Sequence, residues 1–269
     1  PDRLFNECSV YNELISSAEQ APRVVNAAIR HAVELSGVSV ISLPGDVSDL
    51  KASSPSPKYV PSRRPVLTPN EEDVRQLADV LNRAKKVAIF AGAGVEGAHD
   101  EVIELADVLK APIGHTLRGK DFIQYDNPFD VGMTGLLGYG AAAEGMNDAD
   151  VLIMLGTDFP YDQFLPNTFT VQVENRPEKL GRRTDVSLPI HSDVKPLIAA
   201  LLPLLNRDRS DAFLKAKVKK HSKIMHSPVG AYTRNAEHMK PIHPEYAAHI
   251  LNEVAAKDAV FTADTGMCN

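Results

Sequence analysis

The 269-residue sequence contains no tryptophan, only two cysteines, and no apolar run near the ~20 residues that a membrane-spanning helix needs. Cys8 and Cys268 lie near opposite ends of the chain, so a disulfide framework is not expected and a reducing cytoplasm fits best. The opening "PDRLFNECSVYNELI" has neither a basic n-region nor an apolar h-region, so we do not expect a signal peptide. The net charge of -6 disfavours nucleic-acid binding.

The composition that remains is that of an ordinary globular enzyme or binding protein. Hydrophobic residues make up 43% and charged residues 24% of the chain, and the length suggests about two domains. The nine histidines show no metal-ligand spacing, since His221 and His226 are separated within a polar stretch and His238 and His243 bracket a proline. We therefore expect no metal site in this sequence.

The order of apolar patterns predicts an α/β fold with a doubly wound, Rossmann-like parallel sheet. Strand-like runs alternate with helical stripes, which is typical of a parallel sheet covered on both faces. The first unit, residues 1–47, combines a helix over 19–33, carrying Val25, Ala28, Ile29 and Ala32 on one stripe, with a strand in "GVSVISLPGDV". The Ser- and Pro-rich segment 48–67 is interpreted as a linker.

A whole middle domain is expected over residues 68–205. Thr68, Pro69 and Glu71 predict the start of its first helix as N-cap, first residue and capping box. The stripes of its two helices are Val74, Leu77, Ala78 and Leu81, then Val102, Leu105, Ala106 and Leu109. Its strands are expected at Val87–Ala91, Pro112–Thr116, Val151–Gly156 and Phe169–Val173.

The remainder is expected to hold a connector and the start of another domain. Residues 206–242 include a charged helix over 210–221, and residues 243–269 begin with Pro244 at the first position of a helix. That helix carries Ala247, Ile250, Leu251 and Val254, and a strand "AVFTAD" follows it. Because lone strands at both ends leave faces uncovered, we interpret the sequence as a piece of a larger protein.

The turn Gly92-Ala93-Gly94-Val95-Glu96-Gly97 matches a dinucleotide-binding pattern between a strand and a helix. Such a turn lets a phosphate approach the backbone at a helix N-terminus. An NAD site also needs a carboxylate at the end of the next strand, but that strand ends in His115 and Thr116. A turn that only packs helix against strand is the alternative.

Other strand ends favour an extended ligand. "DVGMTGLLGYGAA" (130–142) and "LGTDFPYDQF" (155–164) are rich in small residues, and the second follows the strand "VLIML". The strand "FTVQV" ends at Glu174, a carboxylate suited to the hydroxyls of a ribose. These loops predict a ligand lying across the carboxyl edge of the sheet.

The segments "LPGDV", "AGAGVEGA", "RGKDFIQYDNPFDVGMTGLLGYG", "LGTDFPY" and "HPEYAAHILNEV" followed by "AVFTADTG" resemble the thiamine-diphosphate-dependent pyruvate oxidases, which include quinone-reducing pyruvate dehydrogenases. The resemblance runs over essentially all 269 residues. It implies the end of a pyrimidine-binding domain in 1–47, an FAD-binding domain in 68–205 and the start of a diphosphate-binding domain in 243–269. One departure is Glu174-Asn175-Arg176-Pro177, where the family has Asp-Ile-Asn-Pro.

The resemblance also implies a set of FAD contacts. They are Gly92, Ala93, Gly94 and Val95 at the diphosphate; Arg118 at the diphosphate or flavin; Thr134, Gly135, Leu136, Leu137, Thr157, Asp158, Phe159, Pro160 and Tyr161 around the flavin and ribityl chain; Glu174 at the ribose; and Asp193 at the adenine end. Phe159 and Tyr161 are alternatively core residues. His115 is alternatively a packed histidine or a flavin contact, and both cysteines are expected to be inert.

In the family, pyruvate is oxidatively decarboxylated to acetate and CO2, and electrons pass through FAD to a quinone. The residues that hold thiamine diphosphate and Mg2+ are expected outside this sequence, so the piece is expected to be inactive, with no catalytic residue; Asp264-Thr265-Gly266 is expected near the thiamine site only. The parent is expected to be a cytoplasmic homotetramer that contacts the membrane peripherally through an absent C-terminus. The alternatives are a flavin-free decarboxylase module and an acetolactate-synthase-like enzyme in which FAD is not redox-active.

Overall fold

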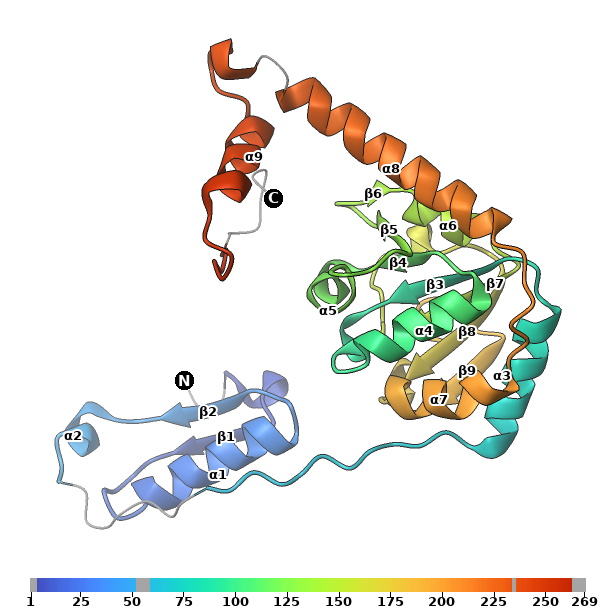
Figure 1. Ribbon diagram of the computed structural model, residues 1–269. Helices are drawn as coiled ribbons and strands as arrows, with labels where there is room; N and C mark the ends of the chain where they lie inside the picture. Colours follow the sequence, from blue (N-terminus) through green and yellow to red (C-terminus); the bar gives the residue numbers. More distant parts are fainter. Residues whose placement is uncertain (1–3, 52–58, 234–235, 263–269) are drawn as a thin grey trace. The chain divides into compact units, whose positions relative to one another are not determined.

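The computed structural model describes residues 4–51, 59–233 and 236–262 (Figure 1). The chain divides into two compact units, Pro1–Pro65 and Val66–Asn269. The division lies within segment 48–67, which the sequence predicts to be a linker. No helix of the described residues combines the length and apolar character that crossing a membrane requires.

The first unit is a parallel βαβ motif. Strand β1 (Tyr11–Leu14) pairs with β2 (Ser39–Ser42), and α1 (Ala21–Glu34) connects them. The short elements η1 (Asn6–Cys8) and α2 (Gly45–Ser48) flank the motif, and Cys8 is a free, exposed cysteine. The predicted helical stripe is confirmed at Ala28 and wrong at Val25 and Ile29, which are exposed, whereas Val24, outside the stripe, is fully buried.

The second unit contains a seven-stranded sheet in the order β6-β5-β4-β3-β7-β8-β9. Its strands are β3 (Val87–Ala91), β4 (Ile113–His115), β5 (Asp130–Met133), β6 (Tyr139–Gly140), β7 (Val151–Leu155), β8 (Phe169–Glu174) and β9 (Leu188–His191). All neighbours pair in parallel except β5 and β6. The doubly wound parallel sheet and its four expected strands are confirmed. Strands β5, β6 and β9 were not predicted; they are short, and β9 carries Pro189 at the sheet edge, where proline is tolerated.

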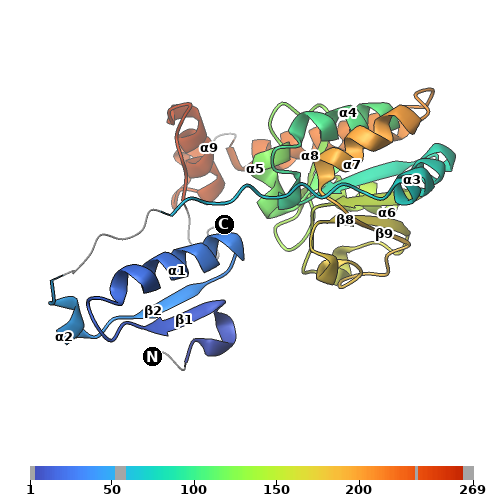
Figure 2. The same cartoon turned by 90° about the horizontal axis from the view of Figure 1, so that it is seen from below.

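Helices cover both faces of this sheet (Figures 1 and 2). The described helices of the second unit are α3 (Glu71–Arg83), α4 (His99–Leu109), α5 (Lys120–Ile123), α6 (Ala142–Asn147), α7 (Val194–Leu201), α8 (Ala212–Thr233) and α9 (Pro244–Val254), of which α9 contacts α8. The 3-10 turns are η2 (Ala93–Val95), η3 (Leu117–Gly119), η4 (Asp162–Phe164), η5 (Pro177–Lys179), η6 (Leu202–Leu204) and η7 (Ala236–His238). Helices α3, α4 and α7 pack on one face, and α6 and α8 contact β4, β5 and β6 from the other.

Two buried clusters hold this fold together. The expected stripes of α3 and α4 are confirmed, since each of their residues is buried against the strands. On the opposite face Phe90, Met146, Met154 and Phe159 belong to a second cluster. Strands β3 and β7 are buried along their whole length, as expected for the centre of a parallel sheet. The predicted cap is wrong, because α3 begins after Asn70 rather than after Thr68.

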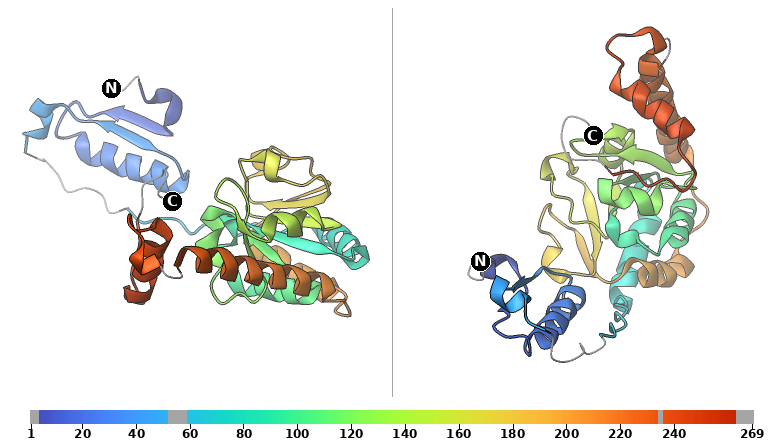
Figure 3. Two further views of the ribbon diagram at one scale, coloured as in Figure 1. Left: turned by 90° about the horizontal axis from the view of Figure 1, so that it is seen from above. Right: turned by 90° about the vertical axis from the view of Figure 1, so that its left-hand side faces the viewer.

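Helix α8 departs most from its sequence interpretation. It begins near the expected residue but continues to Thr233, and it packs on α6, β5 and β6, so residues 206–242 form more than a connector (Figure 3). The Lys217 side chain is only 7% exposed, and its Nζ donates to Glu144 Oε1 at 2.7 Å and to Asp148. The charged helix expected in the connector thus includes a buried lysine whose ion pairs with Glu144 and Asp148 fix α8 to α6.

Helix α9 is the last helix of the described residues. Pro244 occupies the first helical position as expected, but Leu251 and Val254 of the apolar stripe are exposed. The expected strand over 259–264 is absent from its described part, residues 259–262, which is irregular. Asp264-Thr265-Gly266 and Cys268 lie outside the described residues.

Candidate functional site

The residues expected to bind a ligand all lie on the carboxyl edge of the sheet. They follow β3, β4, β5, β7, β8 and β9, which run in the same direction. The strand order reverses between β3 and β7, because the chain moves from β3 to β4 and β5 on one side and then to β7, β8 and β9 on the other. Open α/β sheets bind ligands at such a reversal.

The glycine turn after β3 is packed directly against the loop after β7. Gly92 N–H donates to Leu155 O and Gly94 N–H donates to Gly156 O, both at 2.9 Å. A Cβ on Gly94 would lie 2.5 Å from Gly156 Cα. Gly156 itself has φ +57°, in the left-handed region that favours glycine. The close backbone contact therefore accounts for Gly94 and Gly156 by packing alone, which is the alternative to ligand binding. The hydrogen bonds also occupy two backbone amides of the turn, those of Gly92 and Gly94.

The loop after β4 borders the glycine turn. Thr116 caps η3, since its Oγ1 accepts a hydrogen bond from Gly119 N–H at 3.0 Å. A Cβ on Gly119 would lie 2.5 Å from Ala91 O, so this glycine allows η3 to approach β3. Arg118 lies in η3 and is exposed to solvent. The structure thus places Arg118 in a turn that contacts the glycine turn.

The loop after β5 presents apolar side chains to solvent. Leu136 is 67% and Leu137 44% exposed, whereas Thr134 is 4% exposed. Thr134 Oγ1 has no hydrogen-bond partner within the part of the chain that the structure describes. Gly135, with φ +109°, packs its backbone against the ring of Phe159. A buried hydroxyl and two exposed leucines therefore occupy one loop.

The loop after β7 divides into core and surface residues. Phe159 is 5% exposed and its ring lies edge-on to Phe90 at a centroid distance of 5.1 Å. Thr157 is also buried, whereas Pro160 and Tyr161 are exposed. The Tyr161 ring lies 5.5 Å from that of Phe159. Phe159 is thus a core residue that supports Tyr161 from below.

Asp158 stands among three cations from the β8–β9 crossover. Arg182 Nε donates to Asp158 Oδ1 at 3.2 Å, Arg183 Nε lies 3.5 Å from that oxygen, and Lys179 Nζ lies 3.8 Å from Oδ2. Burial of Asp158 opposes its ionisation, but the Arg182 hydrogen bond and the three positive charges outweigh burial and hold the pKa of the carboxyl below its usual value. No pattern in the sequence predicts this cluster.

Gln172 holds the same two loops from beneath. It lies in the middle of β8 and is 2% exposed. Its Nε2 donates to Thr157 O at 3.1 Å and to Lys179 O at 3.3 Å, and its Oε1 accepts from Gly181 N–H at 2.8 Å. A lone amide in the apolar run "FTVQV" was the sequence feature that could have indicated this role.

The last two residues expected to bind a ligand are Glu174, at the end of β8, and Asp193, after β9. Glu174 is 5% exposed, and its Oε1 accepts from Arg176 N–H at 3.2 Å. Asp193 accepts from Leu67 N–H at Oδ2 and from Asn175 Nδ2 at Oδ1, both at 2.9 Å. Both Asp193 oxygens therefore bond within the protein. Any contact of Asp193 with a ligand stays a prediction, as do the other expected FAD contacts.

A buried polar cluster lies on the β4–β5 side. His115 is 0% exposed; its Nδ1 lies 3.2 Å from Thr116 O and its Nε2 3.5 Å from Asp130 Oδ1. His221 of α8 approaches the other Asp130 oxygen at 3.8 Å. The Tyr139 hydroxyl accepts from Gln124 Nε2 at 2.6 Å. His221, which the sequence placed in a connector, thus packs against the sheet, and His115 is a packed residue.

Stability should depend on pH through His115. Desolvation lowers the pKa of its imidazole below 6.5, against the opposing effects of Asp130 and the Thr116 carbonyl. The folded state then binds fewer protons than the unfolded state, so this contribution is present above pH 6.5 and is lost as the pH falls below it. We expect the urea midpoint of the wild type to fall between pH 7 and pH 5 by more than that of His115→Gln.

The control for this comparison is His226→Gln, which removes an exposed histidine of α8. Its midpoint should change with pH in parallel with the wild type. Equal pH dependence in the wild type and His115→Gln would contradict the assignment. The described residues contain no group of His, Cys, Asp and Glu arranged to hold a metal ion.

Comparison with known proteins identifies relatives of this domain. Residues 74–201 match the family model described as "Thiamine pyrophosphate enzyme, central domain". An "Uncharacterized 42.6 kDa protein in isoamylase 3'region" of Pseudomonas amyloderamosa is 49% identical over 220 residues, or 80% of this chain and 55% of that protein. YdaP of Bacillus subtilis, named as a thiamine pyrophosphate-containing protein, is 33% identical over 98% of this chain and 46% of its own length.

A pyruvate oxidase of Lactiplantibacillus plantarum is 25% identical over 99% of this chain and 45% of the enzyme. Among solved structures, benzoylformate decarboxylase from Polynucleobacter necessarius superposes with a TM-score of 0.64 at 20% identity, over 94% of this chain and 46% of that enzyme. This second likeness concerns the fold alone. The chain spans about half the length of the curated relatives it matches.

Proposed function

Because the chain belongs to the thiamine pyrophosphate-dependent enzyme family, we propose that residues 68–205 bind FAD and that the whole protein is a pyruvate oxidase that passes electrons to a quinone. The similarity to a pyruvate oxidase over 99% of the chain is compatible with this choice, although an acetolactate synthase of Mycobacterium bovis is 28% identical over 95% of the chain. The observation that carries the proposal is the arrangement of the loops after β5 and β7.

These two loops form a surface suited to a flat, largely apolar ring system. Leu136, Leu137 and Tyr161 are exposed, although large apolar side chains are usually buried. The contact between Gly135 and Phe159 holds the two loops together beneath them. Thr134 adds a buried hydroxyl that has no hydrogen-bond partner among the described residues, and a buried polar group of this kind favours a ligand that bonds to it. An isoalloxazine ring meets both requirements, being apolar on its faces and polar at its edge.

The rest of the dinucleotide would extend toward β8. Two amides of the glycine turn already bond to the β7 loop, so Arg118 would supply most of the attraction for the diphosphate, while Gly94 allows a close approach. Glu174 would accept ribose hydroxyls with the carboxylate oxygen that Arg176 N–H does not use. When bound, FAD supplies a two-electron acceptor; this chain binds it, orients it and excludes water.

Further properties belong to the whole protein and follow the same proposal. It would use pyruvate, thiamine diphosphate and Mg2+, and it would transfer electrons to a quinone through peripheral membrane contact from the cytoplasm. Its subunits would associate as a homotetramer. Because the chain covers about half of its relatives, the sites for pyruvate and thiamine diphosphate are expected in the other half.

A flavin-free module is the second candidate. The observation that favours it is the packing of Gly94 on Gly156, which explains the glycine pattern without any ligand. The fold likeness to benzoylformate decarboxylase is compatible with it. An acetolactate-synthase-like protein, with FAD bound but not redox-active, would share the binding site and differ only in the reaction of the whole enzyme.

Titration of the purified chain with FAD, followed by the emission of the flavin, tests the proposal. We expect saturable quenching of flavin fluorescence by the wild type. Leu136→Asp, which places a charge beside the apolar ring, should weaken binding by about tenfold or more. Leu204→Asp makes the same change at an exposed leucine of η6 and should leave affinity unchanged. A folded wild type that does not bind FAD would favour the flavin-free module.

A further inference from the structure

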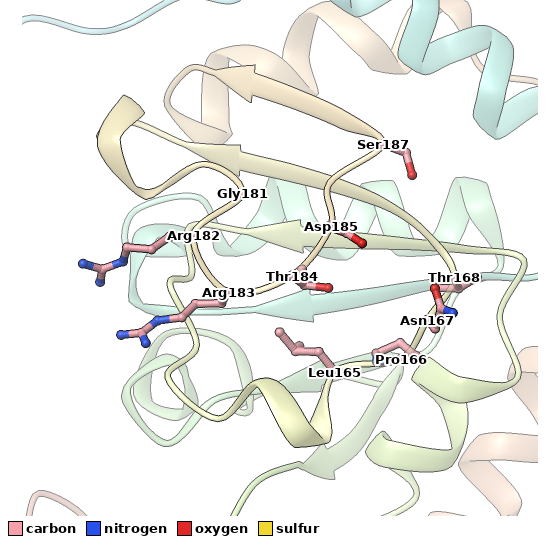
Figure 4. Close-up of a pocket in the computed structure, with 10 residues that line it drawn as sticks. All are labelled: Leu165, Pro166, Asn167, Thr168, Gly181, Arg182, Arg183, Thr184, Asp185 and Ser187. Atoms are coloured by element: carbon pink, nitrogen blue, oxygen red, sulfur yellow. The ribbon is translucent and has the colours of Figure 1, made fainter.

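The connection from β8 to β9 lacks the helix that usually covers a parallel crossover. Between these strands the chain forms only η5 and then an irregular segment through Ser187. A hollow of ≈ 590 Å³ lies between that segment and residues 165–168 (Figure 4). The missing helix thus leaves space on this face of the sheet for a small molecule.

Polar groups line the hollow, and cations stand at one end of it. Figure 4 shows Thr184 and Asp185 between the two arginines and the Asn167–Thr168 segment, whereas Arg182 and Arg183 extend away from the opposite end. Thr168 Oγ1 already donates to Ala149 O. Asn167, Thr184 and Asp185 provide amide, hydroxyl and carboxylate groups, which are suited to the hydroxyls of a sugar.

Three cations gather at one carboxylate. Lys179, Arg182 and Arg183 all lie within 4 Å of Asp158, while Glu178 acts on Arg182 and Asp185 lines the hollow. Asp158 cannot use the full hydrogen-bonding capacity of two guanidinium groups, so donor groups of the arginines remain for a ligand. The side chains of Arg182 and Arg183 remain 47% and 36% exposed, and Asp158 holds them in a fixed arrangement. Guanidinium groups ordered in this way are suited to bind oxyanions.

We propose that the cluster and the hollow form a binding site for a phosphorylated, hydroxyl-bearing small molecule. Lys179, Arg182 and Arg183 hold the phosphoryl group beyond the end of the hollow from which the two arginines extend outward, and Asn167, Thr184 and Asp185 hold the hydroxyls inside. Asp158, at the centre of the cluster, is also an expected FAD contact, so this site borders the proposed FAD site, but its binding of phosphate does not require a flavin on Leu136, Leu137 and Tyr161. The preformed cluster reduces the ordering that binding requires.

Calorimetric titration of the purified chain at low ionic strength, with ribose 5-phosphate and with inorganic phosphate, tests the proposal. We expect saturable binding of both that weakens with added salt, and tighter binding of ribose 5-phosphate. The double variant Arg182→Gln, Arg183→Gln should lose about tenfold or more in affinity, because each charge-assisted hydrogen bond contributes strongly. The control is Arg207→Gln. It removes an arginine whose side chain is 67% exposed and pairs with Glu104, and it should bind both ligands as the wild type does.

Two further variants separate binding from folding. Arg182→Lys, Arg183→Lys keeps the charges and should retain most of the affinity for phosphate, while circular dichroism checks the fold of each variant. Thr184→Val should remove the advantage of ribose 5-phosphate over phosphate. Absence of saturable binding by the wild type, or equal binding by all variants, which would mean an adventitious ion only, overturns the proposal. So does competitive displacement of phosphate by FAD, since the cluster would then belong to the flavin site.

Discussion

Replacing Gly94 by alanine should destabilise the second unit by about 3 kcal/mol, at the upper end of the usual cost of overpacking. The added Cβ would lie 2.5 Å from Gly156 Cα, and the neighbouring atom is backbone, which cannot rotate away. The Gly94 N–H bond to Gly156 O would have to lengthen as well. Urea denaturation followed by circular dichroism measures the loss.

Gly145→Ala is the matched control for this substitution. Gly145 lies in α6, and a Cβ there would meet its nearest neighbours, in Pro112 and Lys217, at 3.8 and 3.9 Å, which is ordinary contact. Alanine is favoured over glycine within a helix, so this variant should be as stable as the wild type or slightly more so. A Gly94→Ala protein as stable as the wild type would show that the two loops are not packed as described.

Replacing Gln172 by leucine should cost about 2 kcal/mol or more and loosen both loops on that face of the sheet. The substitution removes a side chain that is 2% exposed and bonds to Thr157 O, Lys179 O and Gly181 N–H. Each buried polar group left without a partner costs about 1–3 kcal/mol. Amide hydrogen exchange should rise over residues 156–161 and 177–183 while the helices α3 and α4 stay protected.

The comparison for Gln172→Leu is Gln163→Leu, which exchanges the same side chains at an exposed position of η4. It should leave both stability and hydrogen exchange close to the wild type. If Gln172→Leu also left stability and hydrogen exchange unchanged, Gln172 would not be the residue that connects the β7 loop to the β8–β9 crossover.

The long periodic segments were the predictable part of this fold. The stripes of α3 and α4 and the apolar strand β7 bury their residues through local pattern alone, so the sequence places them well. The strands β5 and β6 have four and two residues and include glycines, so they carry too little pattern to be recognised. Exposed helix faces such as Val25 and Leu251 show the limit of periodicity, which gives an apolar stripe but not what covers it.

The candidate site was predictable in its position and less so in its interactions. Strand ends and small-residue loops placed the site at the carboxyl edge, because parallel strands end together. The cations around Asp158 come from a crossover with no regular structure, and His221 reaches Asp130 from a helix far along the chain. Such pairs form only through tertiary packing. The glycine turn shows a different limit, since the same residues serve backbone packing and ligand approach.

The central claim is that the carboxyl edge of the second unit binds a flavin. The most direct test is to incubate the purified chain with FAD, separate free from bound cofactor by gel filtration, and record the visible spectrum of the protein fraction. We expect a flavin absorption band that elutes with the protein. A colourless protein fraction that circular dichroism shows to be folded would contradict the claim.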